Sequence, residues 1–364
     1  MSTIFVSIAS YRDAQLAKTV KSIYENADEP ENLYFGIVNQ EHRNKHIDFP
    51  YIPDHQMNNY KMHSKDARGA GYARKIGMSL YAGQDFYLQT DSHMRYEKGW
   101  DTDLKNMFEQ CKNQEGTNKI ILSQFPAPYL VLSNGKDYFP EHDDEYWSDI
   151  SWTRVVNTAL GYWAGERKVI EDRSKPHPSH TILAGLLFCH GSFVEEIPYD
   201  ERIPFMGEEL CIALRAYTRG WKIYAPNKMV AWHFYKRKEA PKIWSDGVHK
   251  ARWAELEFAS QKVQEKILLA EEQGTFGIGD YNKYLEYQEM IGINFKDVYE
   301  KDLKEKVNLG AIVQEIEFDE NFNMVERGRS GFCINDIHDK CHSIDECVCS
   351  CHDEDREKRN ARRW

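Results

Sequence analysis

A short polar sequence, Asp91-Ser92-His93, follows an apolar run at 86–88 that predicts a buried β-strand. Side chains two residues apart in a strand share one face, so the Asp91 carboxylate and the His93 imidazole are expected side by side at the strand end. Carboxylate oxygens and imidazole nitrogens are ordinary ligands of Mn²⁺ and similar cations, and a metal held there can carry a substrate diphosphate. A strand end closed by a polar turn is the simpler alternative for a lone Asp-x-His sequence.

The residues before this sequence predict the elements that position it. Apolar runs at 4–9 and 33–40 predict two strands, and apolar residues recur at helical spacing between 16 and 23, with Asp13 as the helix N-cap. A strand-helix-strand crossover favours a parallel sheet, whose ligands bind beyond the carboxyl ends of the strands. Polar residues follow both predicted strands: Ser10, Tyr11 and Arg12 after the first, and Asn39 and Gln40 at the end of the second.

A loop with two glycines and two arginines precedes the next predicted helix. Gly69 and Gly71 would let backbone N–H groups approach an anion, and the forked guanidinium groups of Arg68 and Arg74 match phosphate oxygens. The loop therefore predicts a diphosphate cradle. A solvated basic turn is an equally good interpretation of these residues.

The second half of the chain supplies further candidates. Glu208 and Glu209 follow a glycine at the start of a predicted helix, where the helix dipole favours negative charge. A carboxylate at such a junction can also hold a substrate hydroxyl or act as a base. His233 lies near the end of a predicted strand and could be a third metal ligand, although a lone histidine there is usually structural. The segment 126–178 is aromatic and predicted to be irregular, as in a loop-rich acceptor region or packing beneath long loops.

Together these sequences resemble the GlcNAc-transferase family, which includes cytoplasmic enzymes that modify protein hydroxyproline and is distantly similar to the polypeptide GalNAc-transferases. The resemblance covers about residues 4–294 and depends on six motifs in order. These are Ile4 to Asp13, Arg68-Gly69 with Ala73-Arg74, Leu88 to Arg95 with Trp100-Asp101, Pro204 to Glu209, Arg215 with Gly220-Trp221, and Trp232 to Tyr235.

The resemblance implies a GT-A glycosyltransferase fold, which is α/β and Rossmann-like with a mostly parallel central sheet. It implies transfer of a sugar, with GlcNAc expected, from a UDP-sugar to an acceptor hydroxyl with retention. It also implies Mn²⁺ or another divalent cation that bridges the donor diphosphate, with Asp91, His93 and His233 as its ligands. A metal and arginines at the diphosphate would stabilise the charge that develops when the sugar-phosphate bond breaks.

The resemblance further assigns residues to the donor and to the reacting sugar. Residues of the donor site would be Ser10, Tyr11 and Arg12 at the uridine, Arg68 and Arg74 near the nucleotide or its phosphates, and Asp91. Glu208 and Glu209 would face the sugar and acceptor as the catalytic pair, in positioning roles because retention requires no side-chain base. The strand at 185–190 would form the floor of the cleft.

The acceptor is open. The family suggests a protein hydroxyl, and a surface glycan or a hydroxymethylated base in viral DNA are alternatives. The net charge of −11 argues against DNA, whereas the aromatic insert and the basic run at 236–238 favour it. A non-catalytic sugar- or nucleotide-binding module is the alternative from another class, and the complete set of metal and carboxylate candidates argues against that class.

The 364 residues predict three segments: a GT-A catalytic domain at 1–240, a helical and hairpin extension at 241–330, and a Cys/His-rich tail at 331–364. No apolar run approaches the ~20 residues of a membrane span, and the start lacks a signal peptide, so we expect a cytoplasmic protein without membrane contact. The tail could hold a structural Zn²⁺ or be redox-prone without metal. Its candidate ligands are Cys333, Cys341, His342, Cys347, Cys349, Cys351 and His352.

Overall fold

The computed structural model describes residues 2–42, 45–140, 148–157, 162–169, 172–237, 240–247 and 249–300. Within the extension at 241–330, the sequence around Asp319 predicts a hairpin over 312–325. This hairpin and the candidate zinc ligands between Cys333 and His352 lie outside the described residues, so both stay predictions. Among the helices that the structure describes, none combines the length and apolar character needed to cross a bilayer.

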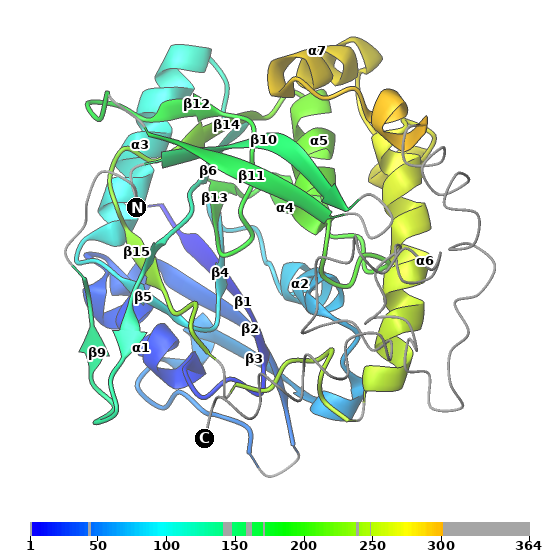
Figure 1. Cartoon of the computed structure of the whole chain (residues 1–364). Helices are drawn as coiled ribbons and strands as arrows, with labels where there is room; N and C mark the ends of the chain where they lie inside the picture. The colour runs from blue at the N-terminus through cyan, green and yellow to red at the C-terminus, as the bar shows by residue number, and fades with distance from the viewer. Residues whose placement is uncertain are drawn as a thin grey trace, which may run out of the picture.

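An eight-stranded sheet forms the centre of the molecule, in the order β12-β14-β6-β13-β4-β1-β2-β3 (Figure 1). Four neighbouring pairs are parallel and three, which involve β12 and β13, are antiparallel. The α/β fold with a mostly parallel sheet is thus confirmed. The strands are β1 (Ile4–Tyr11), β2 (Leu33–Glu41), β3 (Met57–His63), β4 (Phe86–Asp91), β6 (Ile120–Ser123), β12 (His177–Ser179), β13 (Leu186–His190) and β14 (Lys222–Ala225).

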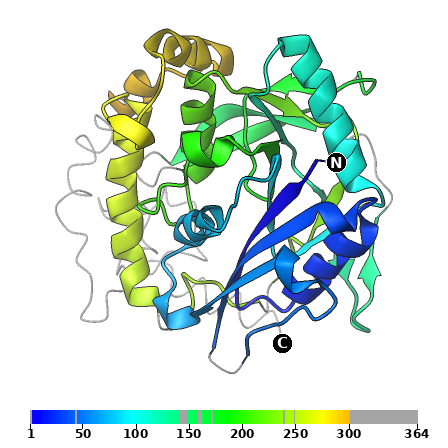
Figure 2. The same cartoon turned by 180° about the vertical axis from the view of Figure 1, so that it is seen from behind.

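Helices cover both faces of this sheet (Figures 1 and 2). They are α1 (Leu16–Asn26), α2 (Ala70–Ser79), α3 (Trp100–Glu115), α4 (Phe193–Glu196) and α5 (Glu208–Thr218). Alternate residues of β1 enter two separate cores: Ile4, Val6 and Ile8 pack with α1 and α3, whereas Phe5 packs with α2 and α5. A strand buried on both faces requires a continuous apolar run, which explains the sequence of β1.

Two C-terminal helices, α6 (Lys250–Leu268) and α7 (Tyr281–Ile291), extend the core beside α5. Ile267, Tyr284 and Tyr287 are buried in the same core as α5, and the Tyr217 and Tyr287 rings lie 5.3 Å apart. The pattern of residues 254–273 predicts a charged amphipathic helix. It is present as α6, which begins four residues earlier and ends five residues earlier. The division of the chain into three segments stays a prediction.

Short strands complete the fold beside the main sheet. A three-stranded sheet joins β5 (Met94–Tyr96), β15 (Ala231–His233) and β7 (Ala127–Pro128). The prediction that 126–178 is irregular is wrong in part, because this segment also contains β8 (Leu130–Val131), β9 (Asp137–Tyr138), β10 (Ser148–Asn157) and β11 (Tyr162–Val169). The 3₁₀ turns are η1 (Pro30–Asn32), η2 (Asp54–Gln56), η3 (Ser64–Asp66) and η6 (Gly274–Phe276).

Candidate active site

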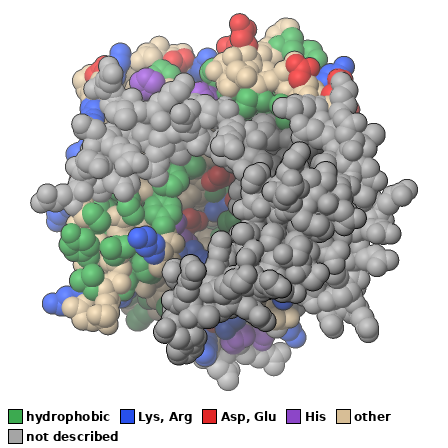
Figure 3. Space-filling view, in the orientation of Figure 1, with side chains coloured by type: hydrophobic (Ala, Val, Ile, Leu, Met, Phe, Trp, Pro, Cys, Tyr) green, Lys and Arg blue, Asp and Glu red, His purple; other side chains and the backbone are tan. Residues whose placement is uncertain are grey.

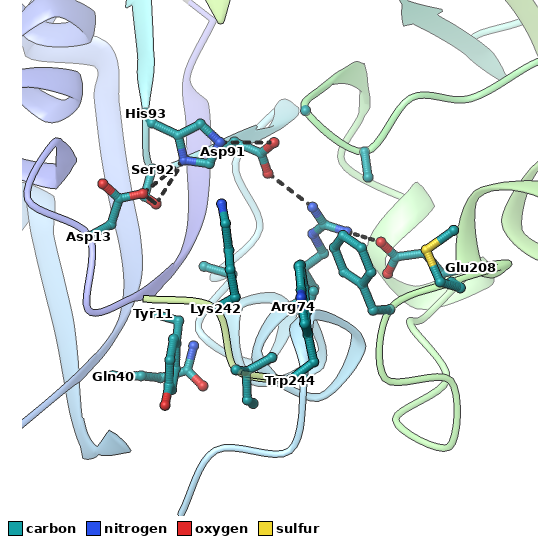
Figure 4. A pocket seen from close by; sticks show the side chains of 18 of the residues that line it. Tyr11, Asp13, Gln40, Arg74, Asp91, Ser92, His93, Glu208, Lys242 and Trp244 are labelled. Atoms are coloured by element: carbon teal, nitrogen blue, oxygen red, sulfur yellow. Dashed lines mark hydrogen bonds and ion pairs between the residues drawn. The ribbon is translucent and has the colours of Figure 1, made fainter. Parts of the chain in front are cut away.

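A pocket of about 430 Å³ lies beyond the carboxyl ends of β1, β2 and β4. Figure 3 shows acidic and basic side chains meeting in a hollow on this face, and Figure 4 shows the pocket from close by. Segments distant in the sequence line it. They are the ends of the three strands, the start of α2, the turn after β4, residues 184–185, the start of α5 with the loop before it, the end of β15, and residues 237 and 241–244.

Three of the predicted residues form a cluster in this pocket. Ligand atoms of Asp91, His93 and His233 all lie within 4.8 Å of one another. Asp91 ends β4, and the prediction that His93 continues the same strand is wrong, because His93 lies in the turn before β5. The antiparallel pairing of β15 with β5 brings His233 beside it, and the Phe234 N–H donates to the His93 carbonyl at 3.1 Å.

Asp13 contacts the Nδ1 atom of His93 and orients the imidazole ring. Its Oδ2 accepts from His93 Nδ1, Ser92 Oγ and Arg237 Nη1, each at 2.9 Å. A carboxylate can only accept, so the proton of His93 is on Nδ1 and the lone pair of Nε2 faces Asp91, 3.9 Å from Oδ2. The prediction of Asp13 as a helix N-cap is wrong, since α1 begins at Leu16 after Gln15.

The charge state of the cluster suits a divalent cation. Burial lowers the pKa of His93 to about 4, although Asp13 and Asp91 oppose this, so the imidazole is neutral at pH 7. Burial opposes ionisation of Asp91, but His233, His93 and Arg74 outweigh it and lower its pKa. One carboxylate and two imidazoles, one of them oriented by a second carboxylate, fit Mn²⁺ or a similar metal.

Arg74 links this cluster to Glu208. The guanidinium is buried, contacts Asp91 Oδ1 at 3.0 Å through Nη2, and pairs with Glu208 Oε1 through Nη1 (Figure 4). Burial raises the pKa of Glu208 to about 7, with Glu209 adding to the rise and Arg74 opposing it. The second oxygen of Glu208, Oε2, is buried and accepts no hydrogen bond within the described part of the chain.

The start of α5 fixes both predicted catalytic carboxylates. Gly207 precedes the helix with φ +84°, and Glu208 and Glu209 form its first turn. Glu209 Oε1 accepts from the Ala184 N–H at 2.7 Å, which ties this carboxylate to the residues before β13. Burial raises the pKa of Glu209 as well. Both glutamates line the pocket. Gly185, the first residue of the strand predicted to form the floor of the cleft, lines it as well.

The glycines before α2 serve close packing. Gly69 has φ +109°, and a Cβ there would lie 2.4 Å from the Pro204 carbonyl oxygen. The Gly71 N–H donates to the same oxygen at 3.1 Å. The prediction that this N–H approaches an anion is therefore wrong, because the loop before α5 already accepts from it.

Of the three residues predicted to bind the uridine, the structure places one, Tyr11, at the pocket. Tyr11 lines the pocket and donates from its hydroxyl to Asp246 Oδ2 at 2.7 Å, and Arg12 pairs with the same carboxylate. Ser10 is buried behind the pocket, and the Arg68 guanidinium lies 4.9 Å from the centre of the Tyr72 ring. Ser10, Arg12 and Arg68 are not among the described residues that line the pocket.

Two lining groups were missed as site residues. Gln40 lies next to Tyr11 in Figure 4, donates from Nε2 to the Ser10 carbonyl at 3.0 Å, and has a buried Oε1 without a partner in the residues described. Its position at a strand end was the available signal. Residues 241–244 also line the pocket, and Trp244 packs against Phe205 with ring centres 5.0 Å apart. Nothing in the sequence indicated that residues 241–244 line the pocket.

A mostly parallel α/β sheet with a metal-ligand cluster and buried glutamates at one pocket has the architecture of a GT-A glycosyltransferase. The family model described as Glycosyltransferase (GlcNAc) matches residues 3–51 and 49–294, and the chain belongs to this family. The comparison with curated proteins gives no match.

The solved structure of GalNAc-T7 agrees with this fold. The crystal structure of GalNAc-T7 with UDP, GalNAc and Mn²⁺ is 15% identical with a TM-score of 0.52, and the match covers 84% of this chain and 58% of that one. S. aureus TarS 1-349 in complex with UDP-GlcNAc is 13% identical with a TM-score of 0.44, and the match covers 79% and 72%. The chain thus spans less than two thirds of the GalNAc-T7 chain. At 15% identity, the likeness to GalNAc-T7 shows the fold alone.

Proposed function

We propose that this protein transfers GlcNAc from UDP-GlcNAc to an acceptor hydroxyl, with Mn²⁺ held by Asp91, His93 and His233. The observation that carries the proposal is the convergence of these three side chains within 4.8 Å in a chain of the GlcNAc family. GalNAc-T7, whose fold is similar, was solved with UDP, GalNAc and Mn²⁺, which supports a UDP-sugar and a divalent cation here.

The bound cation would stabilise the negative charge that develops on the departing diphosphate. Arg74 keeps the Asp91 carboxylate oriented toward the two histidines, and Asp13 keeps the Nε2 lone pair of His93 available. At the other end of the pocket, Tyr11 and Gln40 would bind the uracil. The buried Gln40 Oε1 is an acceptor that matches the ring N–H of this base.

Glu208 and Glu209 position the sugar and the acceptor in this proposal. The unpartnered Glu208 Oε2 would accept a hydrogen bond from a substrate hydroxyl, and Glu209 holds the loop before β13 in place. We propose transfer with retention, as the family resemblance implies. The acceptor then approaches from the face that the diphosphate leaves, so the departing phosphate oxygen takes the acceptor proton and no side-chain base is required.

A protein hydroxyl, as in the cytoplasmic hydroxyproline transferases that the sequence resembles, is the acceptor that we propose first. A glycan and a hydroxymethylated DNA base are the other candidates. Acceptor binding that falls steeply between low and moderate salt would indicate DNA, because phosphate contacts release counterions. Salt-independent binding would leave the protein and the glycan.

The test is release of UDP from a panel of UDP-sugars, with and without Mn²⁺. Wild type is compared with Asp91→Ala and with Asp48→Ala, a control at an exposed aspartate on the loop before β3. We expect turnover of UDP-GlcNAc that requires metal, survives in the control and falls by at least ~10³-fold in Asp91→Ala, because a bound metal contributes several kcal/mol. Turnover of no donor would favour a non-catalytic binding module, whereas equal turnover in both variants would refute the proposed role of Asp91.

A further inference from the structure

Among the described residues that line the pocket, three have cationic side chains other than histidine: Arg74, Arg237 and Lys242. Carboxylates of the pocket already neutralise the two arginines. Arg74 contacts Asp91 and Glu208, and Arg237 contacts Asp13. The Lys242 ammonium has neither a hydrogen bond nor an ion pair with any residue that the structure describes, so it is the lining cation left for a ligand.

The backbone holds Lys242 in a defined position. The N–H groups of Ser245 and Asp246 donate to the Lys242 carbonyl at 3.0 and 2.9 Å, which forms a tight turn. Asp246 in turn accepts from the Tyr11 hydroxyl and pairs with Arg12, and these contacts fasten the turn to the end of β1. The lysine is therefore carried by an anchored turn, and its side chain is the part that can reorient.

The direction of the side chain indicates what it can contact. Figure 4 shows Lys242 extending into the pocket toward Asp91 and His93, with Tyr11 and Gln40 on one side and Arg74 on the other. Its ammonium thus lies between the proposed uracil contacts and the proposed metal ligands. In a metal-bound nucleoside diphosphate, the ribose and the diphosphate lie between the base and the metal, and of these two only the diphosphate is anionic.

Electrostatics supports an anionic ligand at this point. Burial lowers the pKa of Lys242, the Arg237 guanidinium lowers it further, and Asp13 opposes both. A partly desolvated ammonium without a carboxylate partner is costly, and a phosphate oxygen would relieve that cost with a charge-assisted hydrogen bond.

We propose that Lys242 is a further catalytic residue, which binds the donor diphosphate and stabilises the charge on the departing nucleotide. The inference depends on the proposed function. In the transfer, the bond between sugar C1 and the β-phosphate oxygen breaks and its electron pair goes to that oxygen, while the acceptor oxygen bonds to C1. The acceptor proton passes to the released phosphate, and Lys242 donates a hydrogen bond to the diphosphate throughout.

The test compares Lys242→Met, which keeps most of the stem and removes the charge, with Lys242→Arg and with Lys250→Met. Lys250 is an exposed residue at the start of α6 and serves as the control. Calorimetry would measure the affinity for UDP and for uridine, and donor turnover would give kcat/KM. Circular dichroism would establish that each variant is folded.

We expect Lys242→Met to bind UDP about tenfold more weakly, as for a lost hydrogen bond to a charged group, and uridine unchanged. Its kcat/KM should fall about 100-fold, the cost of losing one preorganised donor at a developing charge. Lys242→Arg should recover most of both losses, and Lys250→Met should resemble wild type.

Two failures can be distinguished. If wild type binds UDP and turns over a UDP-sugar while Lys242→Met matches the control in both assays, the role of Lys242 is refuted and the proposed function stands. Equal losses of uridine and UDP affinity would also refute it, because they would indicate a distorted pocket. If wild type neither binds UDP nor turns over a donor, the proposed function and the inference fail together.

Discussion

Two buried carboxylates at opposite sides of the pocket, Asp13 and Glu208, invite comparison. They are 4% and 5% exposed, and each pairs with an arginine, Arg237 for Asp13 and Arg74 for Glu208. Both line the same pocket, and Asp91 lies between them in Figure 4. Burial and ion pairing are thus nearly matched, yet the two groups differ in how their oxygen atoms are used.

Both oxygens of Asp13 are occupied. Oδ1 accepts from the Gln15 N–H, and Oδ2 accepts from Ser92, His93 and Arg237. Burial opposes ionisation of Asp13, but His93 and Arg237 outweigh it and lower its pKa. Among the described residues, Glu208 finds a partner for Oε1 alone, and its pKa rises to about 7 because burial exceeds the effect of Arg74.

This difference in hydrogen bonding distinguishes a carboxylate that supports another side chain from one that can contact a substrate. A carboxylate whose lone pairs are satisfied is stable without a ligand and can hold another side chain in a fixed orientation. A buried oxygen without a partner carries a desolvation cost that a substrate hydroxyl can remove. We therefore assign Asp13 to orientation of His93 and Glu208 to direct contact with substrate, and four variants test this assignment.

The largest effect is expected from Arg74→Met, because it would leave the buried Glu208 and the partly buried Asp91 without their shared cation. We expect the free energy of unfolding to fall by about 3–5 kcal/mol, measured by urea denaturation. Lys75→Met is the control, since Lys75 pairs with Glu201 and the two side chains are 42% and 40% exposed, and it should cost about 1 kcal/mol or less. Equal stability losses would mean that Arg74 does not couple the two carboxylate regions.

Glu208→Gln should have the next largest effect. The native pKa of Glu208 is about 7, so its carboxylate is lost as the pH falls through 7, and wild-type kcat/KM should decline on that acid side. The variant removes the charged acceptor, which should lower kcat/KM about 100-fold. It should also flatten the profile near pH 7, and an acid limb that persists in Glu208→Gln would assign the titration to another group.

Asp13→Asn should act on metal binding with a smaller effect. The Asn side-chain oxygen can still accept from His93 Nδ1, but the negative charge is lost, so Mn²⁺ affinity should fall about tenfold, the lower end for such supporting residues. Calorimetric titration with Mn²⁺ would measure it. Asp101→Asn is the matched control, because Asp101 is also buried and accepts from two backbone N–H groups away from the pocket. Identical metal affinities in the two variants would contradict an orienting role for Asp13.

Gln40→Leu extends the comparison to a neutral side chain with one unused oxygen. Loss of one neutral hydrogen bond is worth ~1 kcal/mol, so uridine affinity should fall about fivefold. Gln56→Leu makes the same chemical change in η2, where Gln56 bonds the backbone of Pro30 and Leu33, and it should leave uridine affinity unchanged. Unaltered uridine binding in Gln40→Leu would show that an unpartnered oxygen in this pocket does not mark a ligand contact.

The sequence by itself determined the parts that depend on short-range patterns. Apolar runs predict the central strands, helical spacing predicts α1 and α5, and glycines mark the start and end of α5, because burial and helix termination act over a few residues. The order of the motifs gave the family, which the family model confirms. The convergence of Asp91, His93 and His233 follows from that resemblance, since no spacing in the chain relates the two histidines.

Only the tertiary structure decided how the polar groups pair. Asp13 is 80 residues from His93, and Arg74 is 134 residues from Glu208, so their contacts depend on strand pairing and on how α2 and α5 pack. The same is true of Gln40 and Lys242, whose neighbours come from other segments of the chain. A sequence pattern identifies which side chains are ionisable. The Oε2 of Glu208, the Oε1 of Gln40 and the ammonium of Lys242, which have no partner among the described residues, become visible only when long-range packing has brought the other side chains together.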